Sequence, residues 1–216
     1  MKILTLNIRV WTRDARRKES GAHWWVARYR AIRAYIEGAN PDIICLQEVW
    51  FPAALVLRLR RLGYKRTGWG FSHPIYVRRD VPVSGRRVSV YVTAATLEDD
   101  DLQVFSVHAH WCAKRFSKAM TWIRKQRDRS VDALAAGDFN TSSVAEIGEA
   151  LNGELTSSRE ALGLAAVDTF ANYKRPTKSH GEIDHIFTSS GVKPLVYLVG
   201  GTDSLSDHRP VTLTFV

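Results

Sequence analysis

The sequence predicts an α/β protein on three observations. Strand and helix patterns alternate over the first 63 of its 216 residues, in the order strand, helix, strand, helix. Further along, short apolar runs typical of strands are separated by segments with helical spacing of apolar residues. The hydrophobic fraction is 45%, which allows a buried core, and we find no repeat, low-complexity block or linker. We therefore expect residues 1–216 to form a single domain.

The first half of the chain supplies two strands and two helices. Lys2–Ile8 alternates between apolar and polar residues, as a half-buried strand does. Residues 23–37 carry apolar residues at helical spacing, and Gly38 fits the end of this helix. The short apolar run Ile43–Gln47 predicts a buried strand. A second helix is expected from Pro52 to Gly63, because proline suits the first turn of a helix and glycine its end.

The second half is expected to be rich in strands. They are Val88–Thr96, Leu102–His108, Val131–Ala136, Ile183–Thr188, Val192–Val199 and Pro210–Phe215. Phe116, Met120 and Ile123 recur at helical spacing and predict a helix after the second of these strands. A short helix is expected to begin after Asn140.

The basic residues are concentrated in the first half of the chain. The formal net charge is +9; residues 1–89 carry 18 Lys and Arg against 6 Asp and Glu, whereas residues 90–216 carry 13 against 16. A basic half favours a polyanionic partner, because Lys and Arg release counterions when they bind phosphates. Composition alone fits a soluble, Arg-rich surface equally well.

Polar residues that can bind a metal ion or move a proton lie at the ends of the predicted strands. They are Asn7, Glu48, His108, Asp138, Asn140, Asp184, Asp207 and His208. Side chains at one set of strand ends can converge on a crevice in an α/β sheet. The oxygen donors of Asn7, Glu48 and Asp207 suit Mg²⁺ or Mn²⁺, and a histidine beside a carboxylate can transfer a proton near pH 7. The set favours metal-assisted attack of water on a phosphorus centre.

Each of these residues, taken singly, also fits a structural role. A lone Asn in a strand is usually a turn or edge residue, and Gly137–Asn140 alone fits a turn in which Asn140 caps the next helix. Polar residues of this kind recur in order at the ends of several predicted strands, which favours a functional site over separate structural roles. The sequence contains no Walker A, Gly-x-Gly-x-x-Gly, Gly-x-Ser-x-Gly or His-Glu-x-x-His motif, which argues against the corresponding enzyme classes.

Six segments spread from residue 6 to residue 211 resemble the endonuclease/exonuclease/phosphatase superfamily, which has the deoxyribonuclease I-like fold. The segments are Leu6-Asn7, Leu46–Val49, Ser106–His108, Gly137–Asn140, Ile183–Phe187 and Ser206–Val211. Gly-Asp-Phe-Asn and Ser-Asp-His-Arg-Pro-Val are the most specific, when paired with the upstream Leu-Gln-Glu. The resemblance implies a four-layer sandwich of two face-to-face β-sheets flanked by helices, with one site at an edge.

The same resemblance implies a metal-binding side of the site. Glu48 is similar to the principal metal ligand of the family, and Asn7 and Asp207 resemble its supporting groups. Asp138 matches the residue that orients or deprotonates the attacking water, and Asn140 matches one that hydrogen-bonds a phosphate oxygen.

The resemblance also implies two catalytic histidines. His208 resembles the histidine that contacts the scissile phosphate, and Asp184 resembles the carboxylate that orients it. His108 matches the second histidine, which stabilises the phosphate or protonates the leaving group. Some relatives pair that histidine with an acid, but residues 65–79 contain none, so the group that orients His108 is left open.

The resulting hypothesis is a Mg²⁺- or Mn²⁺-dependent endonuclease or exonuclease that hydrolyses DNA or RNA. The N-terminal region, rich in Arg and Trp, suits a strand of nucleic acid, although Trp25 lies on the apolar face of its helix and fits the core better. The alternative is a small-molecule or lipid phosphodiesterase or phosphatase of the same superfamily. A catalytically inert nucleic-acid-binding module is the non-enzyme alternative, and the complete set of candidate residues argues against it.

Location and assembly are expected to be simple. We see no secretory leader and no apolar stretch near the ~20 residues that a membrane span needs. The two cysteines are expected to be reduced. These features predict a cytoplasmic protein that does not bind membranes. No heptad pattern or long exposed apolar stripe is present, so we expect a monomer.

Overall fold

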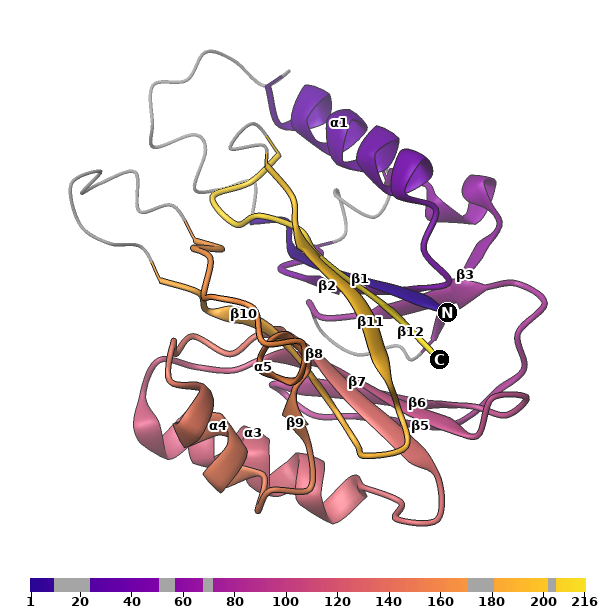
Figure 1. Cartoon of the computed structure of the whole chain (residues 1–216). Helices are drawn as coiled ribbons and strands as arrows, with labels where there is room; N and C mark the ends of the chain where they lie inside the picture. The colour runs from indigo at the N-terminus through magenta and orange to yellow at the C-terminus, as the bar shows by residue number, and fades with distance from the viewer. Residues whose placement is uncertain (10–23, 51–56, 68–71, 171–180, 202–204) are drawn as a thin grey trace.

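Two six-stranded β-sheets pack face to face, and helices cover their outer faces (Figure 1). The computed structural model describes residues 1–9, 24–50, 57–67, 72–170, 181–201 and 205–216. The first sheet consists of β1 (Lys2–Asn7), β2 (Ile43–Gln47), β3 (Tyr64–Thr67), β4 (Ile75–Arg78), β11 (Pro194–Val199) and β12 (Val211–Phe215). The second consists of β5 (Val83–Val88), β6 (Val92–Leu97), β7 (Leu102–His108), β8 (Asp132–Asp138), β9 (Thr156–Ser157) and β10 (Asp184–Thr188). The four-layer α/β sandwich expected from the sequence is confirmed.

The strand order explains which strand ends meet. It is β11-β12-β1-β2-β4-β3 in the first sheet and β5-β6-β7-β8-β10-β9 in the second. In each sheet one central pair is parallel, β1 with β2 and β7 with β8, so both strands of the pair end at the same edge. β12 pairs antiparallel with β1, and β10 with β8, so β12 and β10 begin at that edge.

The alternation along β1 divides its side chains between two cores. Ile3 packs between the sheets in one cluster with Leu134 of β8, whereas Leu4 points outward. The outward side chain packs against Ile32 and Ile36 of α1 (Trp24–Ala39). The central strand is therefore buried on both faces, which fixes its register against the rest of the sandwich.

The outer face of the second sheet is covered by α3 (Ala113–Gln126) and α4 (Val144–Ala150) (Figure 1). Phe116, Met120 and Ile123 of α3 are buried, as their helical spacing predicts. A further single-turn helix, α5 (Ser158–Ala161), follows β9. Within the described ranges, every helix is too short or too polar to cross a bilayer.

Several predicted boundaries are corrected. The predicted strand Val88–Thr96 begins too early: Val88 is the last residue of β5, which was not predicted, and β6 begins at Val92. Between them the hydroxyl of Ser89 accepts hydrogen bonds from the backbone N–H groups of Tyr91 and Val92 and closes a turn. α1 does not end at Gly38 but runs to Ala39. There Asn40 adopts a left-handed backbone (φ 47°) and its N–H bonds the carbonyl of Ile36.

The second predicted helix differs more. Residues 51–56 lie outside the described part of the chain, and Leu59–Leu62 forms a short 3₁₀ helix, η2, rather than the end of an α-helix. Arg58 precedes it with a left-handed φ of 44°, which interrupts helical hydrogen bonding, and Gly63 ends it as expected. The short strands β3, β4 and β9 were not predicted. They have four, four and two residues, too few for a clear alternation.

Gly137 allows β7 and β8 to approach closely where they carry polar side chains. It lies opposite Val107 with φ 154°, and a Cβ there would sit 2.0 Å from the Val107 carbonyl oxygen. Only glycine fits without moving one of the strands. The next pair in the register is His108 opposite Asp138, so this glycine sets the spacing of two candidate catalytic residues.

We expect Gly137→Ala to lower the free energy of unfolding by about 2–3 kcal/mol, because the added methyl group collides with backbone. Gly148→Ala is the matched control. Gly148 lies inside α4, and a Cβ added to it would meet no atom within 4 Å, so alanine there should raise stability by about 0.5–1 kcal/mol. Urea denaturation of both variants tests this, and equal stabilities would contradict it.

Candidate active site

The eight candidate residues follow the strand ends that meet at one edge of the sandwich. Asn7 and Glu48 lie at the ends of β1 and β2, and His108 and Asp138 are the last residues of β7 and β8. The antiparallel pairing places Asp184, the first residue of β10, opposite Asp138. Asn140, Asp207 and His208 lie in the loops that follow β8 or precede β12.

Asn7 connects the carboxylates of the two sheets. Its Nδ2 donates to Oε1 of Glu48 at 3.3 Å and to Oδ2 of Asp138 at 3.0 Å. Its Oδ1 accepts a hydrogen bond from the backbone N–H of Arg9 at 3.0 Å. The side chain is buried, so the amide orientation follows from its partners, and it joins the end of β1 to the end of β8.

Three non-glycine residues of this edge have left-handed backbones. They are Arg9 (φ 57°), Glu48 (φ 60°) and Asn140 (φ 54°), each one or two residues beyond the end of a strand. Such conformations are uncommon for residues with a Cβ and cluster at functional sites. Each one turns the chain out of its strand, so the last polar side chains face the edge of the sandwich.

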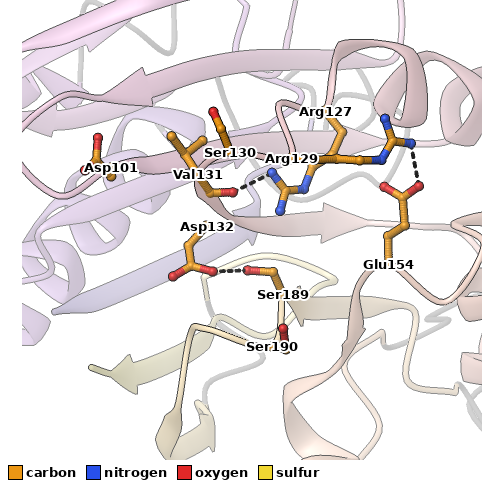
Figure 2. Close-up of a pocket in the computed structure, with 9 residues that line it drawn as sticks. All are labelled: Asp101, Arg127, Arg129, Ser130, Val131, Asp132, Glu154, Ser189 and Ser190. Atoms are coloured by element: carbon orange, nitrogen blue, oxygen red, sulfur yellow. Dashed lines mark hydrogen bonds and ion pairs between the residues drawn. The ribbon is translucent and has the colours of Figure 1, made fainter.

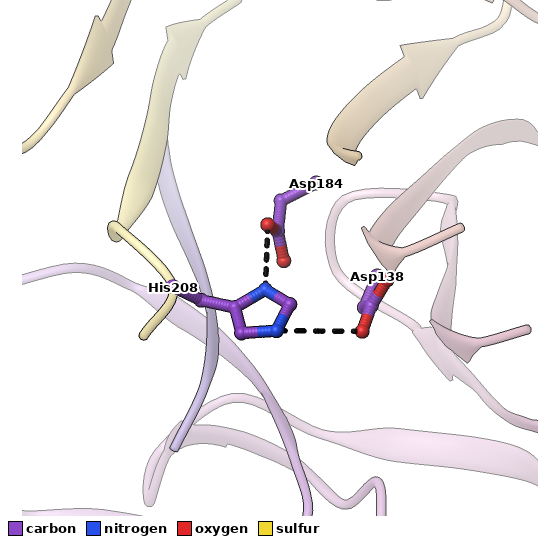
Figure 3. A group of neighbouring side chains, drawn as sticks. All are labelled: Asp138, Asp184 and His208. Atoms are coloured by element: carbon purple, nitrogen blue, oxygen red, sulfur yellow. Dashed lines mark hydrogen bonds and ion pairs between the residues drawn. The ribbon is translucent and has the colours of Figure 1, made fainter. Parts of the chain in front are cut away.

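His208 and Asp184 form a buried hydrogen-bonded pair that also crosses between the sheets (Figure 3). Nδ1 of His208 lies 2.8 Å from Oδ2 of Asp184, and its Nε2 lies 3.9 Å from Oδ2 of Asp138. Oδ2 of Asp184 also accepts a hydrogen bond from Oγ1 of Thr169 at 2.8 Å. The pair fixes the ring of His208 and directs Nε2 towards Asp138.

The pKa values of His208 and Asp138 are shifted by burial and by the charges around them. Burial lowers the pKa of His208, but Asp184 and Asp138 raise it more, to about 10, so the ring is an imidazolium at neutral pH. Burial raises the pKa of Asp138, with the nearby Asp184 adding to the rise and His208 opposing it. A carboxylate whose pKa lies above its usual range is a better proton acceptor near neutral pH.

His108 is held more loosely. Its Nε2 lies 3.8 Å from Oδ2 of Asp138, and a quarter of its side chain is exposed. In place of an acid from residues 65–79, the structure has His73, which is fully buried with Nε2 3.2 Å from the carbonyl of Ser89. Burial lowers the pKa of His73 to about 4, helped by the proximity of His108, so it is neutral. Among the described residues Asp138 is thus the acid nearest to His108.

The oxygen donors near Glu48 fit a hard divalent cation. Glu48, Asn7 and Asp207 offer carboxylate and amide oxygens and no sulfur, which suits Mg²⁺ or Mn²⁺. Asp207 lies beside Arg9, with Nε to Oδ2 at 3.6 Å, and its Oδ1 accepts a hydrogen bond from the hydroxyl of Ser206. That hydroxyl also donates to the carbonyl of Asn7 at 2.7 Å, which holds Asp207 near the end of β1.

A second group of potential ligands in the described ranges is less suited to a cation. Ligand atoms of Asp138, Asp184 and His208 lie within 4.8 Å of one another, and Oδ1 of Asp184 has no hydrogen-bond partner. However, Nδ1 of His208 is engaged by Asp184, and a protonated ring offers no lone pair at Nε2. This group is better suited to holding a proton than a metal ion.

Sequence reasoning missed Thr169 and Phe170. The hydroxyl of Thr169 donates to Asp184 and accepts the backbone N–H groups of Ile183 and Asp184, both at 3.0 Å. The ring of Phe170 lies 4.9 Å from that of His208, centroid to centroid. Both residues belong to a stretch whose sequence has neither strand nor helix periodicity, so no pattern indicated them.

Thr169→Val is expected to lower the free energy of unfolding by about 1–3 kcal/mol, because the buried N–H of Asp184 and the partly buried N–H of Ile183 lose their acceptor. It should also reduce kcat about tenfold, since Asp184 loses a partner that orients it. Thr169→Ser keeps the hydroxyl and is the control. Equal denaturation midpoints and kcat values for the Val and Ser variants would contradict this role.

The cleft at this edge has a volume of about 410 Å³. Its buried floor includes Asp138 and His208, and its rim includes the exposed side chains Val90 and Trp111. The burial of the floor strengthens electrostatic interactions there, while the open rim admits a substrate larger than a single phosphate.

A second cavity of about 400 Å³ lies at the opposite end of β8, around Val131 and Asp132 (Figure 2). Most of its charged groups already have a partner. Arg129 contacts Glu154 at 2.6 Å, and Asp132 accepts a hydrogen bond from the hydroxyl of Ser189 at 2.8 Å. It contains none of the candidate residues, so the edge near Asp138 is the candidate active site.

Comparison with known proteins agrees with this assignment of the fold. No curated protein sequence matches the chain significantly. Among solved structures, a Bacteroides thetaiotaomicron mannosyl-6-phosphatase superposes with a TM-score of 0.77 at 19% identity, covering 100% of this chain and 99% of that one. A humanized D. rerio TDP2 superposes with a TM-score of 0.76 at 19% identity, covering 100% and 98%. D. rerio TDP2 in complex with a single-strand DNA product gives 0.74 at 18% identity, again covering 100% and 98%.

Similarity at these identities shows a shared fold, and the family follows from the sequence. A model of the Endonuclease/Exonuclease/phosphatase family matches residues 10–208. The match covers most of the chain and includes seven of the eight candidate residues, all except Asn7. The chain therefore belongs to the endonuclease/exonuclease/phosphatase family, whose enzymes hydrolyse phosphoester bonds and depend on a divalent metal ion.

Proposed function

We propose that this protein is a Mg²⁺- or Mn²⁺-dependent phosphodiesterase that hydrolyses nucleic acid by in-line attack of water on phosphorus. The observation that carries the proposal is the meeting of both sheets at one edge. There Asn7 links Glu48 to Asp138, and His208 is paired with Asp184 across the sheets. The Glu48 carboxylate, an oxygen donor for a cation, and the proton-transfer residues Asp138 and His208 line one cleft.

The cation side of the site is formed by Glu48, Asn7 and Asp207. These residues would hold a divalent ion, which would neutralise charge on the non-bridging oxygens of the phosphate. The side-chain amide of Asn7 donates hydrogen bonds to the carboxylates of both Glu48 and Asp138. The amide therefore fixes the position of the cation ligand relative to the proton acceptor, which favours a single productive geometry.

Asp138 is proposed to accept the proton of the attacking water. It is buried, its pKa is raised by burial, and its Oδ2 is oriented by Asn7 while its Oδ1 accepts the backbone N–H of Asn140. Asn140 in turn donates from Nδ2 to the carbonyl of Ala109 at 2.9 Å. That bond fixes the amide at the side of the cleft, where its second hydrogen can bond a phosphate oxygen.

The two histidines are proposed to stabilise the developing charge. Nδ1 of His208 donates to Asp184, so the Nε2–H is free to donate to a phosphate oxygen at the mouth of the cleft. His108 lines the same cleft, is less buried, and can protonate the leaving group. Asp184 does not contact the substrate in this account and acts by orienting His208.

Nucleic acid is proposed as the substrate because of charge. The chain carries a formal +9, concentrated in residues 1–89, as expected of a protein that binds a polyanion. The likeness to a TDP2 structure containing single-strand DNA product agrees with this choice. A phosphatase is the second candidate, favoured by the mannosyl-6-phosphatase that superposes with a TM-score of 0.77.

Purified protein should cleave labelled single-stranded DNA or RNA oligonucleotides with Mg²⁺ or Mn²⁺ and lose the activity in EDTA. Mannose 6-phosphate should be hydrolysed at least about a hundredfold less efficiently in kcat/KM. Efficient hydrolysis of mannose 6-phosphate without oligonucleotide cleavage would favour the phosphatase. Binding of oligonucleotide without hydrolysis of either substrate would favour the inert binding module.

The location, oligomeric state and domain number of the protein are inferred from its sequence and its core. We infer that the protein is cytoplasmic, monomeric and built as a single domain over residues 1–216. The shared core supports the last point, because Ile3 and Ile43 of one sheet pack in one cluster with Leu134 and Ile186 of the other. Size-exclusion chromatography, limited proteolysis and cell fractionation test these three inferences.

A further inference from the structure

An exposed tryptophan lies at the rim of the catalytic cleft. The side chain of Trp111 is 79% exposed, the highest fraction among the large apolar side chains that the structure describes. It lines the same cleft as His108, Asp138 and His208. Because an exposed indole is unfavourable in water, its presence beside the catalytic residues indicates a ligand group that covers it.

The indole lies against the ring of its neighbour His110. The two rings lie 4.9 Å apart, centroid to centroid, with 31° between their planes. Nδ1 of His110 accepts the backbone N–H of Cys112 at 2.9 Å, and its Nε2 lies 3.0 Å from Nη1 of Arg115. We call the rings of His110 and Trp111 the aromatic shelf. The hydrogen bond at Nδ1 orients the ring of His110 in advance of substrate binding.

We propose that the aromatic shelf stacks an unpaired nucleobase next to the scissile phosphate, so that the enzyme acts on single-stranded nucleic acid. This inference rests on the proposed nuclease function. Stacking on an aromatic side chain needs a free base face, and bases inside a duplex have both faces covered by their neighbours. The guanidinium of Arg115 beside the shelf supplies positive charge for the adjoining phosphate.

The shelf favours a base over other flat or apolar groups for two reasons. A base linked to phosphate matches an aromatic surface with a cation beside it, here the guanidinium of Arg115. The rim also offers few other apolar groups. Val90, 62% exposed, is the other strongly exposed apolar side chain of the cleft in the described ranges, which is little surface for an acyl chain.

The test compares a single-stranded DNA oligonucleotide with a base-free strand of equal length, in which every nucleotide is a tetrahydrofuran phosphodiester. Wild-type protein should have a KM for the base-bearing strand at least about tenfold lower than for the base-free strand. Trp111→Ala should remove this difference by raising KM for the base-bearing strand, with kcat changed less. Trp111→Phe should retain most of it, because phenylalanine still presents an aromatic face.

Leu198→Ala is the control variant, since Leu198 is 60% exposed on β11 and does not line the cleft. It should leave both KM values unchanged. If wild-type protein cleaves neither strand, the nuclease proposal fails and this inference fails with it. If wild-type protein cleaves both strands with equal KM, or Trp111→Ala preserves the difference, the shelf has no such role while the nuclease proposal stands. A loss confined to mannose 6-phosphate hydrolysis in Trp111→Ala would also overturn it.

Discussion

Asp138→Asn is expected to reduce kcat for oligonucleotide cleavage by about 10³-fold, within the range of about 10²- to 10⁴-fold that general base catalysis contributes. Asparagine keeps the size of the side chain and can still contact Asn7, but it cannot accept a proton from water. It also removes one of the three carboxylates that raise the pKa of His208. Affinity for the oligonucleotide should change little, because Lys and Arg elsewhere supply uniform binding.

The measurements are kcat at steady state, the rate constant of cleavage under single turnover, and Kd for the same oligonucleotide. Asp132→Asn is the matched control, because Asp132 lies at the other end of β8 and bonds Ser189 outside the cleft. It should leave kcat unchanged. A kcat for Asp138→Asn within a few-fold of wild type would remove Asp138 from the chemistry.

Glu48→Gln is expected to lower activity by about 10²- to 10³-fold at low Mg²⁺ concentration, because a neutral amide is a weaker ligand than a carboxylate for a hard cation. Part of the loss should be recovered by raising the Mg²⁺ concentration or substituting Mn²⁺. Such recovery separates lost cation affinity from a misfolded site. The measurement is kcat/KM as a function of metal concentration.

Glu98→Gln is the control for charge, because Glu98 is exposed in the turn between β6 and β7. Its metal titration should match that of wild type. If Glu48→Gln and wild type show the same dependence on Mg²⁺, Glu48 does not bind the cation that the reaction uses.

The sequence was sufficient for the long, regular elements and for the order of the site residues. In α1 the apolar residues Tyr29, Ile32 and Ile36 are buried as their spacing predicts, because one face of a long helix must cover the sheet. The polar residues at strand ends converge because parallel pairing and antiparallel return bring those ends to one edge. Both inferences depend on regularities that a single sequence displays.

Other features depend on contacts between distant segments. The four-residue strands β3 and β4 form because β2 offers an edge with which β4 can pair, which no local pattern reveals. Thr169 supports Asp184 from a loop, and buried His73 lies in the acid-free stretch 65–79. A capping role for Asn140 was a reasonable alternative, but Ser143 accepts the N–H of Glu146 at the start of α4. Asn140 instead bonds Ala109 and Asp138.

We propose that the site is divided between a cation side at Glu48 and a proton-transfer side at Asp138, Asp184 and His208. Anomalous scattering from crystals soaked in Mn²⁺ tests this division most directly. We expect a manganese peak against the Glu48 carboxylate, with the 2.8 Å contact between His208 and Asp184 preserved. A peak bound by Asp138, Asp184 and His208, with that contact broken, would contradict it.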